Sequence, residues 1–195
     1  MIYAIGIIIS YLLGSVPFAL IIANIAGKGD IRQVGSGNIG ATNVMRVGGL
    51  KLAGLVWVLD MAKAMLSVFL GFWLVGEAFG ALCGFFAIFG HCYPVWLRFR
   101  GGKGNSSMFG AILAISPLAF VVLGLEWLLI AFGTGYSAAG AIVGFLVLPF
   151  LGFAISFNVG LVFIAISVLC LWRHRENIIR LVRGTESKIE WRWKK

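Results

Sequence analysis

The residue types best suited to binding an anion gather in a glycine-rich loop between two apolar stretches near the N-terminus. This first loop spans residues 30–46 and reads DIRQVGSGNIGATNVMR. Its glycines allow positive φ and close approach of backbone N–H groups to one oxyanion, while Ser36 and Asn38 add side-chain donors and Arg46 a fixed positive charge. A tight turn with Ser and Asn caps is the alternative, but the loop has more uncharged donors than a turn requires. We therefore interpret it as an anion-binding loop.

A second glycine-rich loop spans residues 89–106 and reads FGHCYPVWLRFRGGKGNS. Glycines surround Lys103 just before an apolar stretch, so a phosphate there can meet N–H groups, an ammonium group and a helix N-terminus. The Walker A pattern is absent, because it needs a longer spacer from an upstream glycine and a Ser or Thr directly after the lysine. Alone, this loop also fits a basic connector at a membrane surface. Paired with the first loop on the same side, it indicates a site for two anionic groups.

Two further polar groups stand out. His174, Asn177 and Arg180 repeat at i, i+3 and i+6, so His174 and Asn177 can reach one ligand from a helix face, although a solvated surface helix fits the spacing equally well. Asp60 and Lys63 lie three positions apart within an apolar stretch. Because charge in hydrocarbon is costly, we interpret them as a structural ion pair that faces the helix bundle.

The sequence predicts neither a cofactor nor a metal. Gly35, Gly37 and Gly40 match the dinucleotide pattern G-x-G-x-x-G, but that site needs a preceding strand and a soluble βαβ unit, and here an apolar helix precedes the glycines. The three cysteines lack the paired spacing of a zinc site.

The elements that position these loops must be membrane helices. Hydrophobic residues make up 61% of the chain, charged residues only 12%, and the mean hydropathy is +1.00. Soluble domains do not reach these values, and in lipid a chain without β-barrel alternation satisfies its backbone as helices. Clear spans are expected near residues 2–25, 52–76 and 79–97. Residues 106–172 fit either four short spans, some of them tilted or re-entrant, or two long ones.

Positive charge predicts the orientation. The formal net charge is +9, and every Lys and Arg except Lys63 falls within residues 28–51, 98–103 or 173–195. If all three stretches face the cytoplasm, the chain has five or seven spans, with its N-terminus outside and its C-terminus cytoplasmic. We expect one integral membrane domain, residues 1–195, in which residues 173–195 form a basic amphipathic tail on the inner leaflet.

Taken together, these segments resemble the bacterial acyl-phosphate:glycerol-3-phosphate acyltransferase family, small integral membrane enzymes of phospholipid biosynthesis. The resemblance covers essentially the whole chain. Three pieces carry it: GSGNIGATN at 35–43 followed by Arg46, GH at 90–91 followed by FRGGKG at 99–104, and HRENI at 174–178 followed by GTE at 184–186. It implies seven transmembrane helices, in the bacterial plasma (inner) membrane, with the active site facing the cytoplasm.

The reaction implied by the resemblance moves a fatty acyl group from acyl phosphate to the 1-hydroxyl of sn-glycerol 3-phosphate, giving lysophosphatidic acid and phosphate. The chain lacks the His-x-x-x-x-Asp pair of other membrane-associated acyltransferases, since Trp96 and Ile179 stand at that distance from the two histidines. An acyl phosphate is already a mixed anhydride with a good leaving group. Orientation and charge stabilisation are therefore expected to be enough.

The hypothesised site has two groups of residues. Catalytic roles, holding the two phosphates, are expected for Ser36, Arg46, Lys103, His174 and Asn177. Substrate-binding roles are expected for Gly35, Gly37, Asn38, Thr42, Asn43, Gly101, Gly102 and Gly104, with the N–H groups of Gly101 and Gly102 directed at phosphate. The expected partners are the two substrates and membrane lipid, and no nucleic acid.

Two rival functions need other features. A transporter or channel for a small phosphorylated anion would need polar lining at the midplane and on both sides, but nearly all polar donors fall on one side. A phosphatidyl-alcohol transferase would need several metal-binding Asp residues, and the chain has only Asp30 and Asp60.

Overall fold

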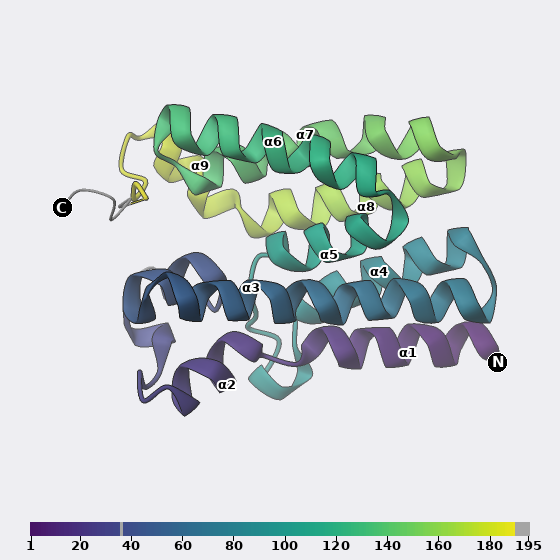
Figure 1. Cartoon of the computed structure of the whole chain (residues 1–195), viewed down its shortest axis with the longest axis horizontal. Coiled ribbons are helices and arrows are strands. Elements are labelled where there is room, and N and C mark those ends of the chain that lie inside the picture. The colour runs from purple at the N-terminus through teal and green to yellow at the C-terminus, as the bar shows by residue number, and fades with distance from the viewer. Residues whose placement is uncertain (36, 190–195) are drawn as a thin grey trace. The chain divides into compact units, whose positions relative to one another are not determined.

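The computed structural model describes residues 1–35 and 37–189, and every regular element among them is a helix (Figure 1). Ser36 and residues 190–195, the end of the expected amphipathic tail, lie outside the described residues. The chain divides into two compact units, Met1–Pro117 and Leu118–Lys195. Each is described by itself below.

The first unit is a bundle in which α1 (Ile2–Ser15), α3 (Ala41–Leu74) and α4 (Glu77–Cys92) lie side by side (Figure 1). Small residues set the close approach: a methyl group added to Gly14 would overlap the backbone of Ala87, and one added to Gly110 the backbone of Met61. The remaining elements are α2 (Phe18–Ile25), α5 (Asn105–Ile115) and the short 3₁₀ helices η1 (Ile31–Gln33) and η2 (Val95–Leu97).

Helix α3 is longer than the sequence predicts. We expected a span near residues 52–76, but the helix begins at Ala41, with a break at Gly49, where φ is 82°. Residues 41–48 carry no proline and follow Gly40, which caps the helix in an extended conformation. Thr42, Asn43 and Arg46 are therefore helical residues, and not loop residues as the first-loop interpretation assumed.

The second unit contains α6 (Pro117–Thr134), α7 (Ser137–Ile155), α8 (Phe157–Arg173) and α9 (Arg175–Val182). With α5, these helices divide the ambiguous apolar region at Ser116, at residues 135–136 and at Ser156, close to the weak breaks in the sequence. The structure thus has four helices there and not two long ones. Trp127 Nε1 donates to the carbonyl of Ser137 at 3.2 Å and so ties α6 to the start of α7.

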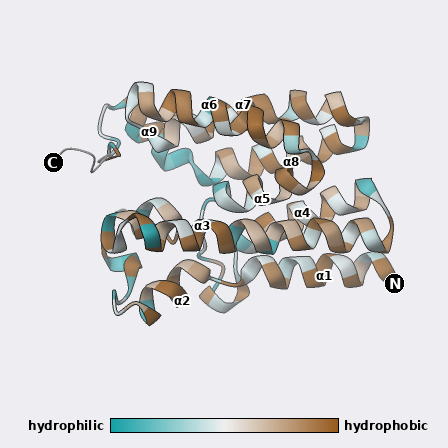
Figure 2. Cartoon of the chain, viewed as in Figure 1, coloured by the Kyte–Doolittle hydropathy of each residue, from teal (hydrophilic) through white to brown (hydrophobic). Residues whose placement is uncertain are grey.

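Within residues 1–35 and 37–189, five helical segments are long and apolar enough to cross a membrane, and a sixth if α8 and α9, bent by 59°, count as one span. Helix α5, with 11 residues, is a shorter apolar helix. Figure 2 shows mostly apolar colouring along α6 and α7, with hydrophilic residues concentrated in loops and at helix ends. Large apolar side chains such as Leu129 (73% exposed) and Phe150 (75%) point outward, as expected where lipid is the solvent. For the described residues, the expectation of an all-helical fold is confirmed, and its apolar helices fit a membrane protein.

Candidate active site

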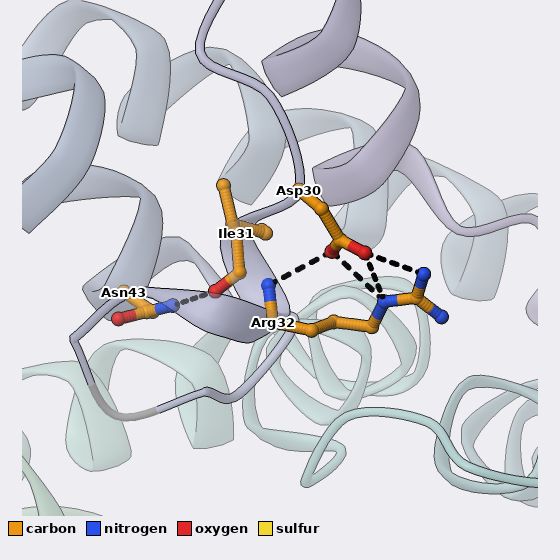
Figure 3. Close-up of polar contacts among 4 residues, drawn as sticks. All are labelled: Asp30, Ile31, Arg32 and Asn43. Atoms are coloured by element: carbon orange, nitrogen blue, oxygen red, sulfur yellow. Dashed lines mark hydrogen bonds and ion pairs between the residues drawn. The ribbon is translucent and has the colours of Figure 1, made fainter.

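The first loop is anchored by a buried amide at the start of α3. The side chain of Asn43 is 1% exposed, and its Nδ2 donates to the carbonyl oxygens of Ile31 at 2.9 Å and Val34 at 3.1 Å. Figure 3 shows Asn43 directed at Ile31 across the loop. One amide therefore fixes the chain on the upstream side of Ser36, which places Asn43 as a support for the loop.

The glycines of the first loop adopt conformations that other residues rarely adopt. Gly35 has φ 63° and Gly37 φ 68°. A methyl group added to Gly35 would overlap Oδ1 of Asn43 and lie 3.7 Å from Cδ of Arg46. The structure thus gathers Gly35, Asn43 and Arg46 at one point of the loop, with the exposed Arg46 on the second turn of α3. Asn38 lies next to Gly40 on the other side of Ser36.

An exposed ion pair at the start of the first loop was not predicted from the sequence. Arg32 donates from Nε and Nη2 to the carboxylate of Asp30, at distances down to 2.6 Å, and the Arg32 backbone N–H donates to the same carboxylate (Figure 3). These hydrogen bonds lower the pKa of Asp30 to about 2 and raise the pKa of Arg32.

The Asp30 ion pair predicts a narrow pH effect. A carboxyl group with a lowered folded pKa stabilises the fold above its unfolded pKa of about 4, and this contribution is lost as the pH falls through about 2. We expect the thermal stability of wild type to exceed that of Asp30→Asn by a small, constant amount from pH 5 to 8, and the difference to vanish between pH 4 and 2. Because the pair is exposed, the effect is small. A difference that grows on acidification would contradict this assignment.

The second loop turns back on the end of α4. Arg98 (φ 51°) and Phe99 (φ 61°) are both left-handed, a conformation that costs about 1–3 kcal/mol for a residue other than glycine. This turn lets the N–H of Gly101 donate to the carbonyl of Cys92 at 3.1 Å, and that of Gly102 to the carbonyl of His91 at 3.0 Å. The expectation that these two N–H groups face phosphate is therefore wrong for this structure: they close the loop.

The part of the second loop that remains suited to an anion is the N-terminus of α5. Gly104 caps the helix with φ 86°, and no described side chain caps it. Lys103, half-buried, immediately precedes this end. Ser107, in the first turn, is fully buried, and its Oγ has no hydrogen-bond partner among the described residues. The first N–H groups of a helix and a lysine together attract an anion.

The second loop leaves no room for a methyl group at Gly101 or Gly102, so alanine at these two positions is expected to lower activity to different extents. A methyl group on Gly101 would overlap the backbone carbonyl oxygen of His91, whereas one on Gly102 would overlap the His91 ring, which can turn. We expect Gly101→Ala to reduce kcat/KM of the acyl transfer implied by the sequence resemblance by about 100-fold and Gly102→Ala by about tenfold, since small displacements of positioning groups have such effects. Steady-state kinetics on purified protein measures both. Equal activity of Gly101→Ala and wild type would contradict the closed loop.

The two loops adjoin within the first unit. Leu97, at the end of η2, packs against the core cluster that contains Ile31 and Ile39 of the first loop. A small cavity is also lined by Ile39 from the first loop and by His91 and Pro94 from the second. Two loops that are more than 40 residues apart in the chain thus adjoin in the first unit.

The third cluster lies in the second unit, where α8 bends into α9. His174 is 4% exposed, its Nδ1 lies 2.8 Å from the carbonyl oxygen of Cys170, and its ring packs against Phe145. Asn177 is 5% exposed, and its Nδ2 donates to Oε1 of Glu186 at 2.9 Å. The alternative of a solvated surface helix therefore does not hold for these two side chains. Glu186 had no role in the sequence-based site, although it stands in the GTE segment.

Comparison with known proteins identifies the family. The family model described as glycerol-3-phosphate acyltransferase matches residues 4–184. The chain belongs to the glycerol-3-phosphate acyltransferase family. A relative of that name from Rhizobium etli is 45% identical over 184 residues, which cover 93% of this chain and 89% of the relative. One from Zymomonas mobilis is 45% identical over 194 residues and covers 92% of both chains.

Solved structures agree with the family assignment. The crystal structure of PlsY (YgiH), an integral membrane glycerol 3-phosphate acyltransferase in its glycerol 3-phosphate form, has a TM-score of 0.91 at 35% identity and covers 96% of both chains. Its lysophosphatidic acid form has a TM-score of 0.89 at 35% identity and covers 95% of this chain and 94% of the other. The resemblance seen in the sequence is confirmed, and this acyltransferase is an integral membrane enzyme.

Proposed function

We propose that this acyltransferase moves a fatty acyl group from acyl phosphate to the 1-hydroxyl of sn-glycerol 3-phosphate, giving lysophosphatidic acid and inorganic phosphate. Acylation of glycerol 3-phosphate follows from the family. The acyl-phosphate donor is supported by the side chains available: the loops of the first unit offer cations and amides, and neither histidine of the chain is followed by an Asp at the His-x-x-x-x-Asp spacing. An activated donor suits a site of that kind.

The observation that carries the proposal is the adjacency of the two loops in the first unit. Arg46 and Lys103 each bring a cationic side chain to a segment with many donors, and the α5 N-terminus adds backbone N–H groups. Two cationic side chains on adjoining loops suit a reaction in which both substrates carry phosphate. The site proposed here keeps Ser36, Arg46 and Lys103 as catalytic residues, with Asn38, Thr42 and the loop glycines binding substrate. Asn43 supports the first loop from α3.

The chemistry needs no covalent enzyme intermediate. The 1-hydroxyl oxygen attacks the carbonyl carbon of the acyl phosphate, the bond from that carbon to the phosphate oxygen breaks, and phosphate leaves with its electron pair. The hydroxyl proton passes to a phosphate oxygen of a substrate. The cations stabilise the charge that develops on the leaving phosphate. His174 and Asn177 of the second unit are proposed to act in catalysis, and each can be tested by substitution.

One assay separates this function from its rivals. Purified protein in lipid is supplied with labelled glycerol 3-phosphate and one of three donors: acyl phosphate, acyl-CoA or acyl carrier protein. We expect labelled lysophosphatidic acid with acyl phosphate alone. Product with acyl-CoA and none with acyl phosphate would overturn the proposed donor. Labelled glycerol 3-phosphate accumulating inside sealed vesicles without product would favour a transporter.

We also propose the membrane topology. Residues 1–195 act as one integral membrane domain with seven spans, in which α5 is the short one and α8 with α9 forms the last span and its amphipathic tail. The N-terminus lies outside the bacterial plasma (inner) membrane, and the two loops face the cytoplasm. The grouping of basic residues at 28–51, 98–103 and 173–195 supports this orientation. Labelling of single cysteines placed at Lys28 and Arg100 tests it, and accessibility from opposite sides would overturn both the topology and the shared site.

A further inference from the structure

A buried ion pair on α3 contacts the chain at the break between α1 and α2. The side chains of Asp60 and Lys63 are 2% and 4% exposed, and Oδ1 of Asp60 lies 2.7 Å from Nζ of Lys63. Nζ of Lys63 also donates to the carbonyl oxygen of Val16 at 2.9 Å. Val16 is followed by Pro17, at which the helical backbone is interrupted before α2 leads to the first loop.

The same ion pair reaches the second loop through His91. Nδ1 of His91 lies 3.5 Å from Oδ1 of Asp60, and the imidazole is 6% exposed. The His91 ring also lies directly against Gly102. A methyl group added to Gly102 would overlap Nε2 of His91. One side chain therefore connects the buried carboxylate to the Gly102 segment. Asp60, Lys63 and His91 line the same small cavity as Ile39 of the first loop.

Stability alone does not explain why Asp60 and Lys63 are buried as an ion pair. Removing two charges from water costs several kcal/mol per ion, and replacing a buried pair with neutral side chains of similar size is often without net cost. What a charged pair adds is direction, because its polar contacts fix the groups around it. Here Lys63 donates to the Val16 carbonyl, and the Asp60 carboxylate lies 3.5 Å from the His91 ring.

We propose that Asp60 and Lys63 are positioning residues for acyl transfer, which hold the Gly102 segment through His91 and the entry to α2 through Val16. The ion pair thereby sets the relative position of the two loops. This inference goes beyond a structural ion pair, and it rests on the proposed substrate-binding role of the second loop. Neither residue needs to touch the substrate.

The test removes both charges together. Asp60→Asn combined with Lys63→Met leaves no unpaired buried charge, so the folded protein should unfold within a few degrees of wild type. It keeps the side-chain sizes but loses the directed contacts. We expect kcat/KM for glycerol 3-phosphate to fall by about 10- to 100-fold, with a higher KM and a lower kcat, because displaced positioning groups have effects of this size.

The matched control is Ser67→Ala, one turn along α3. Ser67 is fully buried, and its Oγ donates to the Lys63 carbonyl at 2.9 Å, within the helix. We expect its kinetics to match wild type. A merely structural pair would change the yield of folded enzyme and leave kcat and KM of the folded fraction unchanged. Wild-type constants in the double variant would therefore overturn the proposal.

A second variant covers the case in which the double variant fails to fold. His91→Gln leaves the ion pair in place and removes the ring between Asp60 and Gly102. We expect a loss of kcat/KM of at least tenfold, and unchanged constants would overturn the proposal. The wild-type enzyme assayed with the three donors reports separately on the proposed function. The variants are compared with wild type on the donor that the wild-type enzyme uses. The donor assay therefore tests the proposed function, and the variant kinetics test the positioning role.

Discussion

Lys103→Met is expected to lower kcat/KM for acyl transfer to glycerol 3-phosphate by about 100- to 1,000-fold while leaving the thermal unfolding temperature nearly unchanged. Lys103 stands directly before Gly104, which caps α5, so its ammonium group and the helix N-terminus can act on one phosphate. Removing one preorganised group that stabilises transition-state charge costs about this much in other enzymes. Methionine keeps most of the side-chain length, which limits the change to the charge.

The control for Lys103→Met is Lys51→Met, an exposed lysine on α3 of the same unit. Its loss should leave kcat and KM within about twofold of wild type, because an exposed cation outside the two loops acts only through screened long-range attraction. Lys103→Arg should recover part of the activity, since the charge remains but its geometry changes. Near-normal turnover by Lys103→Met in folded protein would remove the central cation from the proposed mechanism.

Glu186→Ala is expected to lower activity by about 100-fold and stability by about 2–3 kcal/mol, the usual consequence of leaving charge-assisted hydrogen bonds unmade. The Glu186 carboxylate accepts from Nδ2 of Asn177 at 2.9 Å and from Nε of Arg180 at 2.7 Å. Its side chain is 9% exposed. Without it, Asn177 loses a hydrogen bond that orients its amide.

Glu176 offers a matched comparison for Glu186, because it also faces Arg180. Its carboxylate lies 4.0 Å from Nη1 of Arg180, but its side chain is 67% exposed. An exposed pair contributes about 0–1 kcal/mol, so Glu176→Ala should be nearly wild type in kcat/KM and thermal unfolding. Glu186→Gln, which keeps an acceptor for Asn177 and loses the charge, should fall between the two alanine variants. If Glu186→Ala and Glu176→Ala behave alike, Glu186 does not position Asn177.

The helical membrane architecture could be predicted because its signals are local. Apolar runs interrupted by Ser116, Gly135 and Ser156 mark where helices end, since these positions break an otherwise continuous helical pattern. The segments that we propose to bind anions stand out in the sequence, because glycine-rich loops with cations are rare within such a composition. The start of α3 could not be placed, because residues 41–48 look equally suited to a polar loop and to a helix.

The supporting contacts of the site could not be predicted because they join residues distant in the chain. Nothing near His91 in the sequence indicates that its ring lies between Asp60 and Gly102, and nothing near Asn177 indicates Glu186 as its partner. The hydrogen bonds of the Gly101 and Gly102 N–H groups likewise depend on the left-handed turn at Arg98 and Phe99. Spacing in the sequence identifies which residues can act together. Only tertiary packing decides which of them already form hydrogen bonds or contacts within the protein.

The length of α3 has a consequence for where the reactants meet. After the break at Gly49, residues 50–74 of α3 extend over about 38 Å at 1.5 Å per residue, whereas the hydrocarbon layer is only about 30 Å thick. This part of the helix is enough to cross the layer, so in the proposed topology the segment before Gly49, which includes Asn43 and Arg46, lies at the depth of the lipid headgroups. In the proposed reaction, a water-soluble acceptor then arrives there from one direction and a fatty donor from the other. The proposed product, with a charged head and one acyl tail, forms at the depth where a lipid of that kind already rests, and it can diffuse sideways into the leaflet.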